Sequence, residues 1–102
     1  MLQLRPSCEN CNKPLPADSI DARICSFECT FCVTCAEGLL YNVCPNCGGG
    51  FAPRPIRPSH NWKNGNHLGD NPASTEIRYR PVNPEAHAAF AAAIKNIPPE
   101  ER

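Results

Sequence analysis

Eight cysteines in four close pairs occupy the first half of this 102-residue chain, and the second half has none. The pairs are Cys8 with Cys11, Cys25 with Cys29, Cys32 with Cys35, and Cys44 with Cys47. A pair at this spacing on a tight turn directs both sulfurs to one point, at a Zn–S distance of about 2.3 Å, and two pairs complete a four-thiolate site. The cysteines therefore predict two zinc ions with no ligand left over.

Disulfides and an iron–sulfur cluster are the alternatives to zinc. Residues 1–8, MLQLRPSC, lack the apolar core and the cleavage site of a secretory signal peptide. We therefore expect a cytoplasmic protein, in which thiols stay reduced and closely paired cysteines bind metal rather than each other. The run from Cys25 through Cys29 to Cys32 matches the cluster motif of radical S-adenosylmethionine enzymes, but their barrel needs roughly 200 residues. Ferredoxin spacing fails as well, because Cys44 follows too late, so zinc is preferred.

The order of the pairs predicts which cysteines share an ion. Only two residues separate Cys29 from Cys32, which is too short a loop to separate two independent zinc modules. An interleaved, cross-brace arrangement removes this difficulty, with the first and third pairs in one site and the second and fourth in the other. Site 1 would then hold Cys8, Cys11, Cys32 and Cys35, and site 2 would hold Cys25, Cys29, Cys44 and Cys47. Sequential pairing stays open as the alternative. The spacing resembles that of RING-like and other treble-clef zinc domains, so the expected fold is a small metal-bound α+β module.

Residues 1–51 form this predicted module, and its apolar set is modest. The set comprises Leu2, Leu4, Leu15, Ile20, Ile24, Phe27, Phe31, Val33, Leu39, Leu40, Tyr41, Val43 and Phe51. A core this small gives only marginal stability without a metal or disulfides, and we expect the module to be unfolded without metal. The pattern predicts a hairpin from strands 22–25 and 28–31, and a helix that begins at Thr34 with its hydroxyl as cap. Gly48, after the last ligand, suits a left-handed turn with amide-to-sulfur contacts.

The remainder divides into a linker and a helix. Residues 52–82 are rich in proline and arginine and are expected to be extended and mobile, with a short strand at 75–80. Asn83 is a good N-cap for an amphipathic helix over 83–97. Its apolar stripe comprises Ala86, His87, Phe90, Ala93, Ile94 and Ile97. We expect the stripe to dock on the module. The alternative, recruitment of a partner, makes Phe90, Ile94 and the linker residue Trp62 interaction candidates.

Charge argues against a nucleic-acid-binding module. The formal net charge is zero, and two four-thiolate zinc sites would bring it to about −4. Residues 1–51 carry three basic and five acidic side chains, and only segment 54–80 is basic. Proteins that bind nucleic acid present a basic face, because phosphate contacts supply most of the affinity. A regulator that binds nucleic acid through segment 54–80, with Trp62 stacking on bases, is therefore an alternative only.

Three stretches of the module carry a family resemblance. MLQLRPSCENC, DARICSFECTFCVTCAEGLL and CPNCGGGF resemble a family of short, mostly bacterial proteins called domain of unknown function 1272. The resemblance covers residues 1–57 and implies a small RING-like zinc protein without an assigned activity. Departures from the RING pattern count against a ubiquitin ligase: Asn10 replaces an apolar residue, Cys29 a histidine, and Gly48 a frequent cation.

The sequence predicts no enzyme. Eight cysteines saturate two ions, whereas a catalytic zinc keeps an open position. The expected function is that of a structural zinc protein that acts as a small protein-interaction adaptor, with no membrane and no small-molecule substrate. A redox or zinc-responsive switch based on the thiolates is a further alternative.

Overall fold

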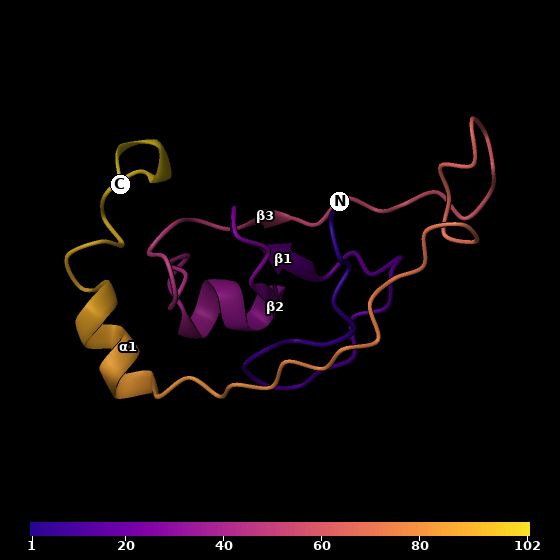
Figure 1. Ribbon diagram of the computed structural model, residues 1–102. Helices are drawn as coiled ribbons and strands as arrows, with labels where there is room; N and C mark the ends of the chain where they lie inside the picture. The colour runs from indigo at the N-terminus through magenta and orange to yellow at the C-terminus, as the bar shows by residue number, and fades with distance from the viewer.

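The computed structural model describes all 102 residues, which form an elongated molecule of 45 × 27 × 18 Å. A small sheet and one short helix lie at its centre, and the C-terminal half of the chain runs around them (Figure 1). The elements are β1 (Ala22–Ile24), β2 (Thr30–Cys32), η1 (Cys35–Leu39), β3 (Ala52–Pro53), α1 (Pro84–Ala91) and η2 (Pro99–Glu101). None of the helices has the length and apolar character that a bilayer span requires.

The sheet is antiparallel, in the order β2-β1-β3. Strands β1 and β2 confirm the predicted hairpin, but the second strand begins at Thr30 rather than at residue 28. Glu28 lies in the turn instead, with a positive φ of 66° and its amide donating to Cys25 O. Strand β3 was not expected, and it carries the pairing past the predicted module boundary at residue 51. Pro53 fits there because β3 is an edge strand.

Element η1 begins directly after Thr34, as predicted, but its capping differs from the prediction. The Thr34 side chain makes no capping hydrogen bond, and the Cys35 amide donates to Cys32 Sγ at 3.5 Å. A cysteine sulfur thus takes the role expected of the threonine hydroxyl. The turn is wide, since Leu40 N donates to Cys35 O, and it ends where Tyr41 and Asn42 adopt positive φ.

Sulfur makes up much of the core. Six of the eleven residues in the central buried cluster are cysteines, and Leu15, Phe31 and Leu40 are its largest apolar members. Three residues of the predicted apolar set are wrongly placed inside, because Ile20 is 79%, Phe27 is 72% and Tyr41 is 43% exposed. The number of apolar side chains buried in the core is therefore even smaller than the composition indicates.

Segment 52–82 follows a path tied to the module by arginine side chains. Arg54 is buried, and its guanidinium donates to the carbonyls of Arg5, Leu15 and Pro16 at 2.8, 3.2 and 2.8 Å. Beyond it, Arg57 donates to Leu2 O and to Asn71 O, both at 2.6 Å. The prediction of an extended, mobile linker did not include these hydrogen bonds from the guanidinium groups.

The predicted strand over 75–80 is wrong. Residues 75–80 are assigned to no strand, and they run back along the module between the protruding loop and α1 (Figure 1). Arg80 N donates to Glu9 O at 2.7 Å, which is a single bond rather than a ladder. Pro81 interrupts any continuation of that pairing, because proline lacks an amide hydrogen.

Helix α1 begins as predicted but ends early. Asn83 Oδ1 accepts from Ala86 N at 3.0 Å, and Pro84 occupies the first turn. After Ala91 the chain continues in tighter turns, with Ile94 N donating to Ala91 O at 2.9 Å. The helix proper therefore stops at Ala91 instead of continuing to about residue 96.

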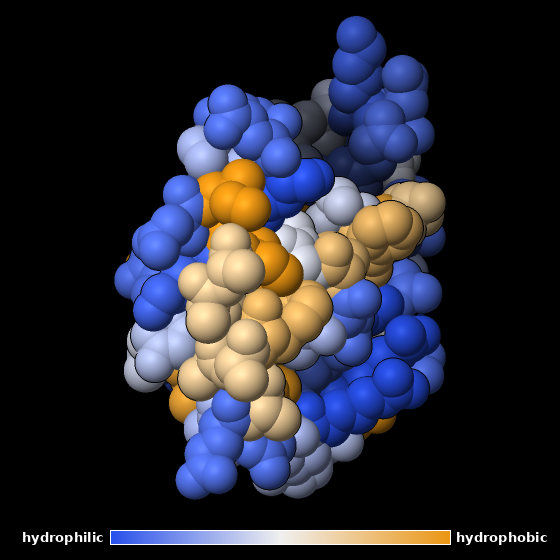
Figure 2. Space-filling model, turned by 90° about the vertical axis from the view of Figure 1, so that its left-hand side faces the viewer, coloured by the Kyte–Doolittle hydropathy of each residue, from blue (hydrophilic) through white to orange (hydrophobic).

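The face that α1 buries differs from the predicted stripe. His87 and Ala91 are its buried residues, whereas Ala86 and Ala93 are exposed and Phe90 is 46% exposed. The helix docks on the module through His87 Nε2, which lies 2.9 Å from Leu40 O. On the side of the molecule where α1 lies, apolar residues form a continuous band at the surface (Figure 2). The most buried residues of α1 thus lie at one edge of the stripe, and the ring of Phe90 is only half covered.

Candidate metal centre

The sulfurs of Cys8, Cys11, Cys32 and Cys35 form one tight group. They all lie within 4.8 Å of one another, and Cys11 Sγ is 3.8 Å from Cys32 Sγ. Four thiolates at the Zn–S distance around a tetrahedral ion have sulfurs about 3.8 Å apart. The group therefore has the dimensions of a four-thiolate metal site.

The first pair of this group sits on a turn that several bonds hold in place. Cys8 N donates to Lys13 O and Asn12 N to Cys8 O, both at 2.9 Å, and Cys11 N donates to Cys8 Sγ at 3.5 Å. Glu9 fixes the turn from the inside, because its buried carboxylate pairs with Arg5 at 2.9 Å and accepts from the Thr30 amide. This ion pair was not among the sequence predictions.

A second group contains Cys25, Cys44 and Cys47, whose sulfurs also lie within 4.8 Å of one another. The predicted role of glycine after the last ligand is confirmed. Gly48 has a φ of +77° and donates to Cys44 O at 2.8 Å, and Gly49 N donates to Cys47 Sγ at 3.4 Å. The chain thus gathers the first and third pairs in one group, and the last pair with Cys25 in the other.

Cys29 is the one cysteine outside these two groups. It is buried, and Asn46 Nδ2 donates to its sulfur at 3.3 Å. Asn46 lies between Cys44 and Cys47, so this bond places Cys29 Sγ beside the second group. The structure thus holds a group of four sulfurs and a group of three with Cys29 next to it.

An asparagine repeat relates the two groups. Asn10 and Asn46 each stand directly before the second cysteine of a pair, in CENC and CPNC. Asn10 Nδ2 donates to Cys35 Sγ at 3.3 Å, the same distance as from Asn46 Nδ2 to Cys29 Sγ. In the sequence, Asn10 stood out only as a departure from the RING pattern. The shared asparagine was the signal that would have revealed both contacts.

Burial raises the pKa of four of the grouped thiols, those of Cys8, Cys25, Cys35 and Cys44, above the ordinary value, and neighbouring cysteines add to each rise. The pKa of Cys11 is lowered against the effect of burial, because the Lys13 backbone and neighbouring cysteines hydrogen-bond its sulfur. A positive ion among these sulfurs would stabilise their thiolate form. The donor set is all sulfur, which suits zinc and iron–sulfur clusters.

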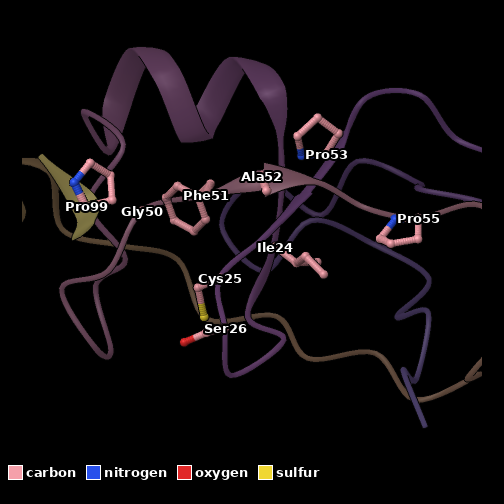
Figure 3. A pocket seen from close by; sticks show the side chains of 9 residues that line it. All are labelled: Ile24, Cys25, Ser26, Gly50, Phe51, Ala52, Pro53, Pro55 and Pro99. Atoms are coloured by element: carbon pink, nitrogen blue, oxygen red, sulfur yellow. The ribbon is translucent and has the colours of Figure 1, made fainter.

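A hollow of about 490 Å³ borders the second group at Cys25. Ile24, Phe51, Pro53 and Pro99 contribute to its wall, and Ser26 brings a hydroxyl (Figure 3). No histidine or carboxylate lines it. The hollow therefore offers apolar contact beside the metal group rather than acid–base chemistry.

The predicted interaction residues lie apart from one another. Trp62 is 80% exposed, with His60 edge-on at 5.8 Å between ring centroids. Phe90 and Ile94 instead lie over Gly48, at the end of the last cysteine pair. Phe90 and Ile94 are therefore placed as docking residues. Trp62 is the most exposed of the three.

Comparison with known proteins places the module in a family. Residues 1–57 match the family described as Protein of unknown function (DUF1272). An uncharacterized protein of Rhizobium meliloti (strain 1021) is 61% identical over 59 residues, which cover 58% of this chain and 70% of that protein. No solved structure matches. Since the matched family spans more than half of the chain, this protein belongs to the DUF1272 family.

Proposed function

We propose that this protein is a structural zinc module in which two ions are held in a cross-brace. Site 1 comprises Cys8, Cys11, Cys32 and Cys35, and site 2 comprises Cys25, Cys29, Cys44 and Cys47. The observation that carries the proposal is the first group, whose four sulfurs all lie within 4.8 Å of one another. Each ion would join two cysteine pairs that are separated by another pair in the sequence.

The asparagine repeat supports Cys29 as the fourth ligand of site 2. Asn10 donates to Cys35, a member of the complete group, and Asn46 makes the equivalent bond to Cys29. Hydrogen bonds of this kind orient the ligands of metal sites and compensate part of their charge. By this equivalence Cys29 stands to site 2 as Cys35 stands to site 1, and we infer that its sulfur is the fourth ligand.

Four thiolates around each ion leave no position for a substrate or a water molecule. A catalytic zinc needs such a position, generally with three protein ligands. The histidines are engaged elsewhere: His87 contacts Leu40 O, and His67 lies 3.3 Å from an oxygen of Asp70. We therefore propose a structural role for the metal and no enzymatic activity.

Metal analysis of protein purified without air tests the proposal. Two zinc ions per chain and no iron–sulfur absorption are expected, and cobalt substitution should produce the bands of tetrahedral thiolate sites. Cys29→Ser should lose about one ion while site 1 stays loaded, and Ser26→Ala, three residues away, is the matched control. Two ions retained in Cys29→Ser would remove Cys29 from the ligand set, and a brown sample would overturn zinc.

We propose further that the module serves as a protein-interaction adaptor. Support comes from the exposed side chain of Trp62 and the half-exposed ring of Phe90 on a scaffold whose interior is largely sulfur. In affinity capture, Trp62→Ser should lose a partner that the wild type retains, with zinc content unchanged. The double variant Phe90→Ser with Ile94→Ser tests the helix in the same way. Capture unchanged in both variants would reject these residues as the interface.

One observation favours a second candidate, a thiolate-based redox switch. Each sulfur group has one exposed member, Cys11 in the first and Cys47 in the second. An oxidant such as peroxide reaches these sulfurs first, and oxidation of a ligand releases metal. Metal release at peroxide concentrations that leave other zinc modules intact would support the switch, and equal resistance would reject it.

Nucleic-acid binding by segment 54–80 loses support. Arg54 and Arg57 direct their guanidinium donors at backbone carbonyls, and Arg78 lies 3.4 Å from Glu76. Lys63 and Arg80 are the cations of the segment that remain unpaired. Absence of binding to mixed oligonucleotides at low salt would exclude this function, because phosphate contacts are strongest there.

A further inference from the structure

Asn10 contacts both the first sulfur group and the C-terminal segment. Its Nδ2 donates to Cys35 Sγ at 3.3 Å, and its Oδ1 accepts from Val82 N at 2.8 Å. The side-chain amide of Asn10 therefore joins the sulfur of Cys35 to the backbone of Val82, which lies 72 positions after Asn10 in the chain.

Neighbouring bonds show that this contact belongs to a docked segment, residues 80–91. Arg80 N donates to Glu9 O at 2.7 Å, one residue before Asn10. Val82 also packs against the central cluster, and His87 Nε2 contacts Leu40 O at 2.9 Å. The segment thus lies along the first cysteine pair before α1 packs beside the end of η1.

The equivalent residue of the second group has no such link. Asn46 makes the same bond to a sulfur, but no hydrogen bond joins its side chain to residues 80–91. The asymmetry separates two roles. Both asparagines orient a sulfur, and Asn10 alone is itself oriented by the C-terminal segment.

The physical consequence is a coupling. A bond to Oδ1 fixes the plane of the amide, and it also polarises the N–H group that points at Cys35 Sγ. Residues that support metal ligands in this way typically change metal affinity about 10- to 100-fold when they are altered. Coupling between two binding events is reciprocal, so a metal that holds Cys35 in place also favours docking of the segment.

We propose that Asn10 couples the docking of residues 80–91 to the metal of the first sulfur group, so that the docked segment slows the loss of that ion. The inference rests on the proposed function, because it needs a metal in this group. It adds that the two sites differ in how they meet the segment: Asn10 joins residues 80–91 to Cys35 of site 1 by hydrogen bonds, whereas Phe90 of the segment lies over Gly48 beside site 2 without a hydrogen bond to a ligand there. Asn10 acts here as a positioning residue for Cys35.

Cadmium NMR of the full chain, loaded with cadmium at both sites, tests the coupling. Each line is assigned through its couplings to cysteine Cβ protons. Val82→Pro removes the amide that donates to Asn10. Its matched control, Ser74→Pro, removes another amide of the C-terminal half, which donates to Gln3 O at 2.9 Å, away from the metal. Val82→Pro should move the site 1 line alone and speed cadmium transfer from site 1 to a chelator about tenfold. Ser74→Pro should leave both lines and both rates unchanged.

A second pair of variants keeps the test independent of the proline substitutions. Asn10→Ala and Asn46→Ala each delete an amide donor to a sulfur, and each should move the line of its own site. Only Asn10→Ala should also lower the hydrogen-exchange protection of the Val82 amide. Equal effects of Val82→Pro and Ser74→Pro, or unchanged Val82 protection in Asn10→Ala, would overturn the coupling while two cadmium lines still uphold the metal sites. A wild-type chain without a line from site 1 would overturn the proposed function and the coupling together.

Discussion

Replacing Arg54 with methionine removes the donors that join strand β3 to the N-terminal loop. The guanidinium bonds Arg5 O, Leu15 O and Pro16 O, three carbonyls of segments that precede β1. Ser19 N also donates to Pro16 O, whereas no other donor reaches Arg5 O or Leu15 O. The substitution therefore leaves two carbonyls in buried bonds without a partner.

The expected loss of stability follows from these two carbonyls. Each buried acceptor left unsatisfied costs about 1–3 kcal/mol, which sets a range of about 2–6 kcal/mol. Two effects reduce the loss. Methionine fills part of the volume, and it avoids the cost of burying a cation, a cost that is also visible in the lowered pKa of Arg54. We expect a net destabilisation of about 2–3 kcal/mol in the metal-loaded protein.

Urea unfolding at a fixed free zinc concentration measures this change, because metal binding itself adds to the apparent stability. Arg57→Met is the matched control. Arg57 also donates to two backbone carbonyls, but these belong to Leu2 and Asn71, neither of which is buried. Its effect should be the smaller one, with zinc content equal in both variants. An unfolding free energy of Arg54→Met within about 0.5 kcal/mol of the wild type, the range of ordinary surface substitutions, would refute the reasoning. Equal losses in both variants would refute it too.

Three further predictions concern the metal, two glycines and the helix cap. Removal of metal with a chelator should abolish amide protection in β1 and β2, since six of eleven core residues are cysteines; protection that persists would contradict a metal-dependent core. Gly48→Ala should destabilise the protein by about 1 kcal/mol and weaken site 2, because the residue has a φ of +77°. Gly38→Ala, where an added methyl meets nothing within 4 Å, should be neutral or stabilising in the same urea assay, and a reversed order would contradict this reading. Asn83→Ala should cost about 1 kcal/mol and lower exchange protection in the first turn of α1, and unchanged protection there would refute the cap.

The sequence was most informative where one residue type has one structural use. Cysteine spacing identified the half of the chain in which the sulfurs gather into two groups, and the glycine after Cys47 correctly indicated a left-handed turn. Asn83 before proline located the start of α1. In each case the constraint is local: a ligand spacing, a positive φ, or an orphan amide at a helix terminus. Such constraints act within a few residues and are therefore legible in sequence.

Contacts between distant segments could not be predicted in the same way. Nothing in the spacing of Arg54 indicates that its acceptors are backbone carbonyls some 40 positions earlier, because every residue carries a carbonyl. Hydropathy was misleading for Ile20 and Phe27, since buried sulfurs occupy the volume that these side chains would fill in an ordinary core. The end of α1 was also missed, because the alanine-rich sequence has no breaker before Pro98 and the tighter turns follow from docking.

The C-terminal half makes most of its hydrogen bonds to the module with backbone atoms of the module. Its amides and side chains bond Gln3 O, Glu9 O, Leu40 O, Asn42 O and Gly48 O. A carbonyl is available whatever the side chain, so these bonds depend on the path of the module's backbone and little on its sequence. Asn10 is the exception, because its side chain supplies the acceptor for Val82. The two sulfur groups lie within the core around which that backbone path runs. Under the proposed function, docking of the C-terminal half follows metal binding, and Asn10 is the position where a side chain of the module hydrogen-bonds to both a sulfur and the C-terminal segment.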